Sequence, residues 1–189
     1  MRKIPTLFAR DLRLGRIRTV LPVVTPGCEW VINGEGLATR KWDGTCTMLD
    51  EHGNWWARRE VKPRRDIPPG YVVEEHDETT GKLVGWEPMA QSPFSKIHAE
   101  AAAHHVDGPG TYELVGPKIN GNPDGFDCHA LIPHGYAPAA ERADIEAAPR
   151  DYDGLRDWLL DREYEGLVWH HPDGRMAKIK SRDFVPKEQ

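Results

Sequence analysis

Short extended runs joined by glycine-containing turns restrict most strongly what this chain can fold into. Residues 38–49 (ATRKWDGTCTML) are rich in threonine and apolar residues, and after the turn DEHGN residues 55–62 (WWARREVK) run back. Residues 166–170 (GLVWH) and 175–180 (RMAKIK) flank a second turn, HPDG, which has Pro172 at its first central position. These patterns predict two β-hairpins.

Helical signals are fewer and do not alternate with the strand signals. Residues 71–75 and 111–116 are further strand candidates. Helices are predicted at 95–105, which is alanine-rich with Ser95 as the N-cap candidate, and near 153–163, where apolar residues recur at helical spacing. We therefore expect an α+β fold with largely antiparallel strands rather than a doubly wound sheet. The glycine-rich fingerprints of Rossmann and P-loop nucleotide sites are absent from the sequence.

The length predicts a single domain, and the cysteine pattern is typical of an intracellular protein. A chain of 189 residues predicts a single domain spanning 1–189 that needs no disulfides for stability. Cys28, Cys46 and Cys128 lack C-x-x-C spacing and are expected to be reduced thiols. No run approaches the roughly 18 apolar residues of a membrane span, and the first residues contain no signal-peptide core. We expect a cytoplasmic location.

The chain is acidic overall, yet its basic residues are clustered. Lysine and arginine number 25 against 30 aspartates and glutamates, a net charge of −5, which excludes a generally basic nucleic-acid-binding surface. Basic residues gather in three segments, 1–20, 58–65 and 175–182. One hypothesis is that they form a face that binds a polyanion; the alternative is ordinary solvated surface.

The segment Lys41-Trp42-Asp43-Gly44 stands out within the predicted strand 38–49. Lysine is normally a surface residue, yet here it follows threonine and apolar residues that favour strands. An Asp-Gly pair is unfavourable inside a strand and indicates a bulge or a site. Gly44 lacks a side chain where the phosphate of a ligand could approach closely. Four residues alone are a weak signal, because most such matches are turns.

Three distant segments strengthen this signal. They are Y-E-L at 112–114, E-G-L-V-W at 165–169 and K-I-K at 178–180. Because side chains alternate along a strand, Lys178 and Lys180 share one face. Two ammonium groups on one face repel each other unless an anion or a carboxylate lies between them. One interpretation is a solvated edge strand protected by lysine, and the other is a phosphate clamp that faces Lys41 and Glu165.

In this order, the four segments resemble the motifs of the covalent lysine nucleotidyltransferases, which include ATP-dependent polynucleotide ligases and mRNA capping enzymes. Within that superfamily the chain most resembles small single-domain 5′-3′ RNA ligases of the RNA ligase 1 type, also in A-T-R-K-W-D-G-T-C and in W-A-R at 56–58. The resemblance implies an adenylation-domain fold over 1–189, with antiparallel sheets flanking a nucleotide cleft and no OB-fold domain.

The resemblance also implies roles for single residues. Lys41 would attack the α-phosphate of ATP, release pyrophosphate and hold AMP as a phosphoramidate. Glu113 would bind the ribose, and Glu165 would bind a divalent metal, Mg²⁺ or Mn²⁺. Lys178 and Lys180 would hold the α-phosphate.

Further positive side chains would complete the reaction. Arg58, with Arg40 as an additional candidate, would contact the nucleotide phosphates or the incoming 5′-phosphate of an RNA. AMP would then pass to that 5′-phosphate, and a 3′-hydroxyl would displace it.

Elementary chemistry agrees with these roles. A free lysine has a pKa near 10.4 and is only about 0.1% deprotonated at pH 7.4. A lysine nucleophile therefore needs its pKa lowered by roughly two to three units, which cationic neighbours achieve. Arg40, Lys178 and Lys180 would be such neighbours, and they would also stabilise charge on the transferred group.

The alternatives within and outside the superfamily stay open. DNA ligases and capping enzymes usually carry an arginine just after the motif glycine, where this chain has Thr45-Cys46. This difference favours an RNA ligase over a DNA nick ligase or a guanylyltransferase. A catalytically inactive nucleotide- or RNA-binding module is the alternative from another class.

The residue that stacks on the adenine is not evident from the sequence. Trp86, Phe126 and Tyr136 are candidates, and each is alternatively a core residue. The segment 122–125 (NPDG) has turn chemistry and lies close enough to Glu113 in sequence to form a pocket rim.

Overall fold

Every ladder between two named strands of this protein is antiparallel. The computed structural model describes residues 3–11, 19–78, 80–104 and 108–185. Their strands form sheets of two, three and six strands, and the helices are short. The predicted α+β class with antiparallel sheets is confirmed.

The chain forms two compact units. The expectation of a single adenylation domain over 1–189 stays a prediction. The six-stranded unit comprises residues 1–3 and 43–134, and the three-stranded unit comprises residues 4–42 and 135–189. The chain passes between them after Lys3, at Trp42-Asp43 inside the K-W-D-G motif, and again after His134.

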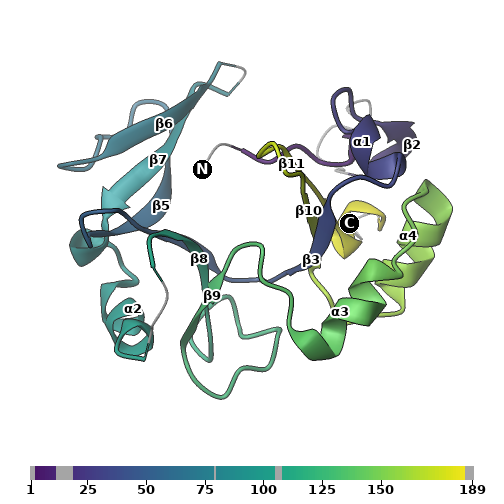
Figure 1. Ribbon diagram of the computed structural model, residues 1–189. Coiled ribbons are helices and arrows are strands. Elements are labelled where there is room, and N and C mark those ends of the chain that lie inside the picture. Colours follow the sequence, from purple (N-terminus) through teal and green to yellow (C-terminus); the bar gives the residue numbers. More distant parts are fainter. Residues whose placement is uncertain (1–2, 12–18, 79, 105–107, 186–189) are drawn as a thin grey trace. The chain divides into compact units, whose positions relative to one another are not determined.

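The six-stranded unit is built on a sheet with the strand order β6-β7-β5-β4-β8-β9 (Figure 1). The strands are β4 (Thr45–Leu49), β5 (Trp55–Val61), β6 (Val72–Asp77), β7 (Lys82–Pro88), β8 (Gly110–Val115) and β9 (Ala130–Pro133). Between β7 and β8 lie the 3-10 helix η1 (Met89–Gln91) and the helix α2 (Ser95–Ala102). The predicted helix 95–105 is present as α2, but it ends at Ala102, and Ala103 and His104 form a turn. The N-cap is Phe94, which makes no side-chain capping bond, rather than the predicted Ser95, which is the first helical residue. Residue 105 lies outside the described residues.

Side-chain alternation along β8 separates the core of this unit from its polar face. Tyr112 and Leu114 are buried with Ile119, Leu131 and Ala101. The residue between the first two, Glu113, therefore points to the other face of the sheet.

The three-stranded unit has a sheet in the order β11-β10-β3 and a separate hairpin of β1 and β2. Its strands are β1 (Phe8–Arg10), β2 (Val20–Val24), β3 (Leu37–Lys41), β10 (Gly166–His170) and β11 (Met176–Lys180). Its helices are α1 (Glu29–Ile32), α3 (Ala139–Glu146), α4 (Tyr152–Leu160) and the 3-10 helix η2 (Ser181–Asp183). The predicted hairpin at 166–180 and the predicted helix near 153–163 are confirmed.

One face of the three-stranded sheet forms the second core. Leu167 and Ile179 are fully buried on this face, together with Trp169 and Ala177. Helices α3 and α4 (green in Figure 1) add Ile145, Leu155 and Leu159 to the same cluster. Because side chains alternate, Lys41, Lys178 and Lys180 belong to the opposite face.

The prediction of one strand over 38–49 was wrong. The strand β3 ends at Lys41, and β4 begins at Thr45 in the sheet of the other unit. Only the second half of the predicted run pairs with β5. Aspartate and glycine are poor strand formers, and here they end one strand before the next begins.

Two further expectations concern cysteines and membranes. Cys28, Cys46 and Cys128 are free thiols in the structure. Among the helices of the described residues, none combines the length and the apolar character that crossing a bilayer requires.

Gly166 allows the closest backbone approach in the three-stranded sheet, and this makes a prediction. A Cβ at this position would lie 1.9 Å from the carbonyl oxygen of Ile179. We expect Gly166→Ala to lower the free energy of unfolding by about 1–3 kcal/mol or more, because the backbone must move. Gly108→Ala is the control, since a Cβ there meets no atom within 4 Å. Thermal unfolding followed by circular dichroism measures both, and equal midpoints would contradict the prediction.

Candidate active site

The last residue of β3 places Lys41 in a row with Gly166 and Lys180. Gly166, on the middle strand, pairs with Lys41 on one side and with Lys180 on the other. Residues opposite each other in neighbouring strands point to the same face. With strands about 4.8 Å apart, the two lysines start roughly 10 Å from each other and flank a position that has no side chain. A group of suitable size can lie between their amines.

The carboxylate of Glu165 occupies this space. Its Oε2 accepts a hydrogen bond from Lys41 Nζ at 2.5 Å, and its Oε1 accepts one from Lys180 Nζ. Arg182 Nη2 lies 3.9 Å from the same Oε1. The side chain of Glu165 is only 9% exposed. The structure therefore brings together three of the residues that the sequence singled out, on one face of one unit.

The pKa values of this cluster follow from burial and charge. Burial raises the pKa of Glu165, but the ammonium groups of Lys41 and Lys180 outweigh it and hold the pKa below its usual value. Burial lowers the pKa of Lys180, and the charge of Lys41 lowers it further against the pull of Glu165. With Arg182 included, three cations surround one carboxylate. The surplus of positive charge suits the binding of a further anion such as a phosphate.

Lys178 lies two residues before Lys180 on β11 and shares its face of the sheet. On one side it pairs with Val168 of β10, and on the other its N–H donates to the carbonyl of Pro5 and its carbonyl accepts from the N–H of Leu7. The strand that carries Lys178 is thus held in the interior of the unit. A contact of Lys178 with a phosphate stays a prediction.

Arg40 lies on the face of β3 opposite to Lys41, because it precedes Lys41 by one residue. Its Nη1 donates to Glu141 Oε1 of α3 at 2.7 Å. Its guanidinium stacks over Trp42 at 4.1 Å and over Tyr164 at 4.5 Å from the ring centroids. These contacts join β3 to α3, and the phosphate contact expected of Arg40 stays a prediction.

Glu113 is the centre of a second polar group, in the six-stranded unit. Its Oε1 accepts from the backbone N–H of Gly44 at 3.1 Å. Its Oε2 lies 2.9 Å from Nε2 of His134, and Nδ1 of His134 lies 2.9 Å from Oγ1 of Thr111. This chain of contacts holds the orientation of the Glu113 carboxylate. Sequence reasoning missed His134, since nothing in its spacing connects it with Glu113.

Gly44 is required by the strand beside it. A Cβ at this position would lie 2.4 Å from the carbonyl oxygen of Leu114 and 2.7 Å from Cγ of Glu113. The sequence suggested a close approach of a ligand, whereas the close approach in the structure is that of β8. A contact of Gly44 with a nucleotide stays a prediction.

Arg58 shares a face of the six-stranded sheet with Glu113. Trp56 pairs with Met48, and Met48 pairs with Thr111. Trp56, Met48 and Thr111 therefore point to the same face. Arg58 comes two residues after Trp56, and Glu113 comes two residues after Thr111. Because side chains alternate along a strand, Arg58 and Glu113 point to that face as well. The Nε of Arg58 is buried and has no hydrogen-bond partner among the described residues. Buried polar atoms are nearly always bonded, so this nitrogen is suited to an anionic ligand.

The structure holds no preformed cage for a metal within the described residues. No three histidine, cysteine, aspartate or glutamate side chains there are grouped closely enough to bind a metal ion. Glu165 supplies a single carboxylate. Mg²⁺ is commonly bound by one or two carboxylates together with substrate phosphates and water. The donor set therefore fits a metal that is held jointly by Glu165 and a nucleotide.

The basic segments are largely engaged in ion pairs. Such pairs join Lys3 to Asp77, Arg10 to Asp183, Arg59 to Glu87, Arg175 to Asp173 and Lys180 to Glu165. Lys62, Arg64 and Arg65 are exposed, and no ion pair joins them to another described residue. Arg13, Arg16 and Arg18 lie outside the described residues. A single polyanion-binding face stays a prediction.

The candidates for adenine stacking differ in their surroundings. Trp86 is a core residue, 3% exposed, and its Nε1 donates to Glu74. Phe126 is half-buried, and Tyr136 is exposed.

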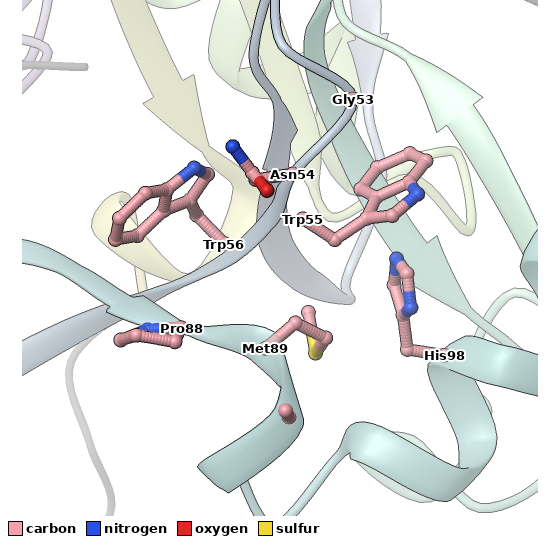
Figure 2. Close-up of a pocket in the computed structure, with 8 residues that line it drawn as sticks. Gly53, Asn54, Trp55, Trp56, Pro88, Met89 and His98 are labelled. Atoms are coloured by element: carbon pink, nitrogen blue, oxygen red, sulfur yellow. The ribbon is translucent and has the colours of Figure 1, made fainter. Parts of the chain in front are cut away.

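A shallow pocket opens elsewhere in the six-stranded unit (Figure 2). The ring of Trp55 meets His98 edge-on at 4.5 Å, and Trp56 lies beside Pro88. None of the residues that line this pocket is a predicted site residue. The chemistry predicted from the motifs therefore does not lie in it.

Comparison with known proteins gives an independent view. No protein-family model matches the chain. RNA ligase 1 of Rattus norvegicus is 30% identical over an alignment of 159 positions that covers 66% of this chain and 45% of the relative. The chain is similar to RNA ligase 1. The protein of that name from Mus musculus is 31% identical with the same coverage, and that from Danio rerio is 32% identical over 77 positions, 36% of this chain and 22% of the relative.

This similarity supports the relationship to RNA ligases that the order of the motifs predicted. The chain spans less than half the length of the mammalian RNA ligase 1 proteins.

The depressed pKa of Glu165 predicts how stability depends on pH. A carboxyl group whose pKa is lowered in the folded state stabilises the protein above its unfolded pKa and loses that contribution as the pH falls through the folded value. In metal-free buffer, we expect the free energy of unfolding to decline as the pH falls below about 4.5. Glu165→Gln should flatten this decline and lower stability at neutral pH, because Lys41 and Lys180 lose their counter-charge.

Urea denaturation at a series of pH values measures the effect. Glu163→Gln is the matched control, since Glu163 is exposed and two residues away. The prediction fails if both variants show the same pH dependence.

Proposed function

We propose that this chain is an ATP-dependent RNA ligase of the covalent lysine nucleotidyltransferase superfamily. It joins 5′-phosphate and 3′-hydroxyl ends through a covalent lysyl-AMP intermediate on Lys41. The observation that carries the proposal is the row of Lys41, Gly166 and Lys180 with Glu165 between the two amines. The similarity to RNA ligase 1 supports the substrate class.

In the first step Lys41 acts as the nucleophile. Its uncharged amine attacks the α-phosphorus of ATP, the N–P bond forms, and the bond to pyrophosphate breaks. Lys180 and Lys178 lie on the same face as Lys41 and stabilise negative charge on the transferred phosphoryl group. Arg58 contacts phosphate through its Nε, which has no hydrogen-bond partner among the residues that the structure describes.

In the resting structure the amines of Lys41 and Lys180 both bond the carboxylate of Glu165. Glu165 therefore moves away from Lys41 before that amine attacks ATP, and the place between the two amines then becomes available to a phosphate. Glu165 is also the residue that would hold Mg²⁺ or Mn²⁺ together with the ATP phosphates. When bound, such an ion would neutralise part of the negative charge of the ATP phosphates.

The later steps transfer AMP to RNA. An oxygen of the RNA 5′-phosphate attacks the adenylyl phosphorus, the N–P bond to Lys41 breaks, and a phosphoanhydride forms. The 3′-hydroxyl of a second end then attacks the RNA 5′-phosphorus, which forms the phosphodiester and releases AMP. Glu113, held by His134 and Gly44, binds the ribose in this proposal.

Covalent labelling tests the first step. Incubation of the protein with ATP and Mg²⁺ or Mn²⁺ should add one AMP to the intact mass, and GTP should add nothing. Lys41→Arg should abolish the addition, because a guanidinium keeps the charge but is not a nucleophile. Lys62→Arg is the control and should be labelled like the wild type. Label in the Lys41 variant would place the nucleophile elsewhere, and a GMP adduct would indicate a guanylyltransferase.

Salt dependence tests RNA binding by the exposed basic turn. We expect joining of 5′-phosphorylated RNA to weaken steeply with salt, because each phosphate contact releases counterions. Replacement of Lys62, Arg64 and Arg65 by glutamine should reduce the salt slope of ligation and leave AMP addition to Lys41 unchanged. The same assay with DNA ends separates an RNA ligase from a DNA ligase. A flat salt response of the wild type would show that these side chains are solvated surface only.

A further inference from the structure

We propose that the loop at residues 116–125, which follows β8, positions Lys41 by holding Asp43 and Gly44, and that Asn120 is the positioning residue of this loop. The inference rests on the proposed function, because it concerns the same lysine. We refer to Asn120, Asp124 and Glu113, with the two residues that they hold, as the clamp.

The clamp binds both backbone N–H groups of the Asp43-Gly44 pair, the carbonyl of Gly44 and one carboxylate oxygen of Asp43. The Nδ2 of Asn120 donates to Oδ1 of Asp43 at 3.0 Å and to the carbonyl oxygen of Gly44 at 2.9 Å. Oδ2 of Asp124 accepts from the N–H of Asp43 at 2.9 Å, and Glu113 accepts from the N–H of Gly44. Between the end of β3 and the start of β4, hydrogen bonds from side chains thus take the place of the backbone hydrogen bonds of a sheet. All five residues belong to the six-stranded unit.

The contacts of the loop at 116–125 hold Asn120 in the position from which it bonds Asp43 and Gly44. Ile119, its neighbour, is 1% exposed and anchors the loop in the core. Asn120 has a φ of 47° and Asn122 a φ of 55°, values that asparagine tolerates better than most residues. Asn122 closes the loop, since its Oδ1 accepts from the N–H of Phe126 and its Nδ2 donates to the Phe126 carbonyl. The loop therefore has its own closure, which does not involve Asn120.

The covalent chain transmits the effect to Lys41. Only Trp42 separates Lys41 from the clamped pair, so the Cα atoms of Lys41 and Asp43 are at most about 7.6 Å apart. Holding Asp43 on both its backbone and its carboxylate limits the positions that Lys41 can take. A displacement of about 1 Å at a reacting group can slow a reaction by about 100-fold.

The two left-handed asparagines allow a matched experiment. Glycine adopts a positive φ without strain, so Asn120→Gly and Asn122→Gly both keep the backbone and remove one side chain each. Single-turnover formation of the AMP adduct, measured over a range of ATP concentrations, separates the maximal rate from the apparent affinity. We expect Asn120→Gly to lower the maximal rate at least about tenfold, with less than about threefold change in the ATP concentration at half-maximal rate. Asn122→Gly should stay within about threefold of the wild type in both.

Asn120→Asp is a second variant that keeps the local shape. It replaces the donating amide by a carboxylate that faces Oδ1 of Asp43, so it should slow adduct formation more than Asn120→Gly does. Amide hydrogen exchange, measured by NMR without ATP, reports on the clamp itself. Exchange of the Asp43 and Gly44 amides should accelerate in Asn120→Gly and stay at the wild-type rate in Asn122→Gly, while the melting temperatures of both remain close to that of the wild type.

Several results would overturn the inference. Equal rates for the two glycine variants would show that the loop is only a turn, as would an Asn120→Asp protein that reacts at the wild-type rate. Asn120→Gly could also have a much lower melting temperature, with a rate of adduct formation reduced only by the fraction of protein that is unfolded. That result would show a purely structural role for Asn120. A wild-type protein that takes up no AMP would end both the proposed function and the positioning role, whereas the exchange rates would still show whether the clamp exists.

Discussion

One carboxylate holds the lysine-bearing face of the three-stranded unit together. Glu165 precedes Gly166, which pairs with Lys41 on one side and with Lys180 on the other. Two ammonium groups in a largely buried place are unfavourable unless an anion lies between them, and both oxygens of Glu165 meet this need. The same excess of positive charge favours a phosphate group. Stability and the proposed chemistry therefore depend on one arrangement.

Two motif glycines have structural reasons of their own. Gly166 is pressed against the backbone of Ile179, and Gly44 against the backbone of Leu114. In both places a neighbouring strand of the same unit, rather than a ligand, excludes a side chain. The clamp around Asp43 and Gly44 adds hydrogen bonds to this close approach. The K-W-D-G motif thus requires its glycine for packing, independently of any contact with a nucleotide.

The local sequence pattern predicted the fold best where two strands that pair in a sheet are also consecutive in the chain. The hairpin at 166–180 has a proline-containing turn and paired strands, and α4 has Leu155 and Leu159 one turn apart, so both could be predicted. The break after Lys41 could not, because threonine and apolar residues continue the strand pattern into β4. In the site, the motif residues were found by their order, whereas His134 and Asn120 were missed because turn residues and single histidines carry no distinguishing spacing.

The sequence by itself determined which side chains share a strand face, because the side-chain period of a strand is two. It therefore placed Lys178 with Lys180, whereas Arg40, expected as a cationic neighbour of Lys41, lies on the other face of β3 and bonds Glu141. Only the tertiary structure decided that β3 lies beside β10 and that Glu165, 124 residues after Lys41, reaches its amine. Pairing between strands so distant in the chain depends on the burial of whole faces in a common core, and no local preference encodes it.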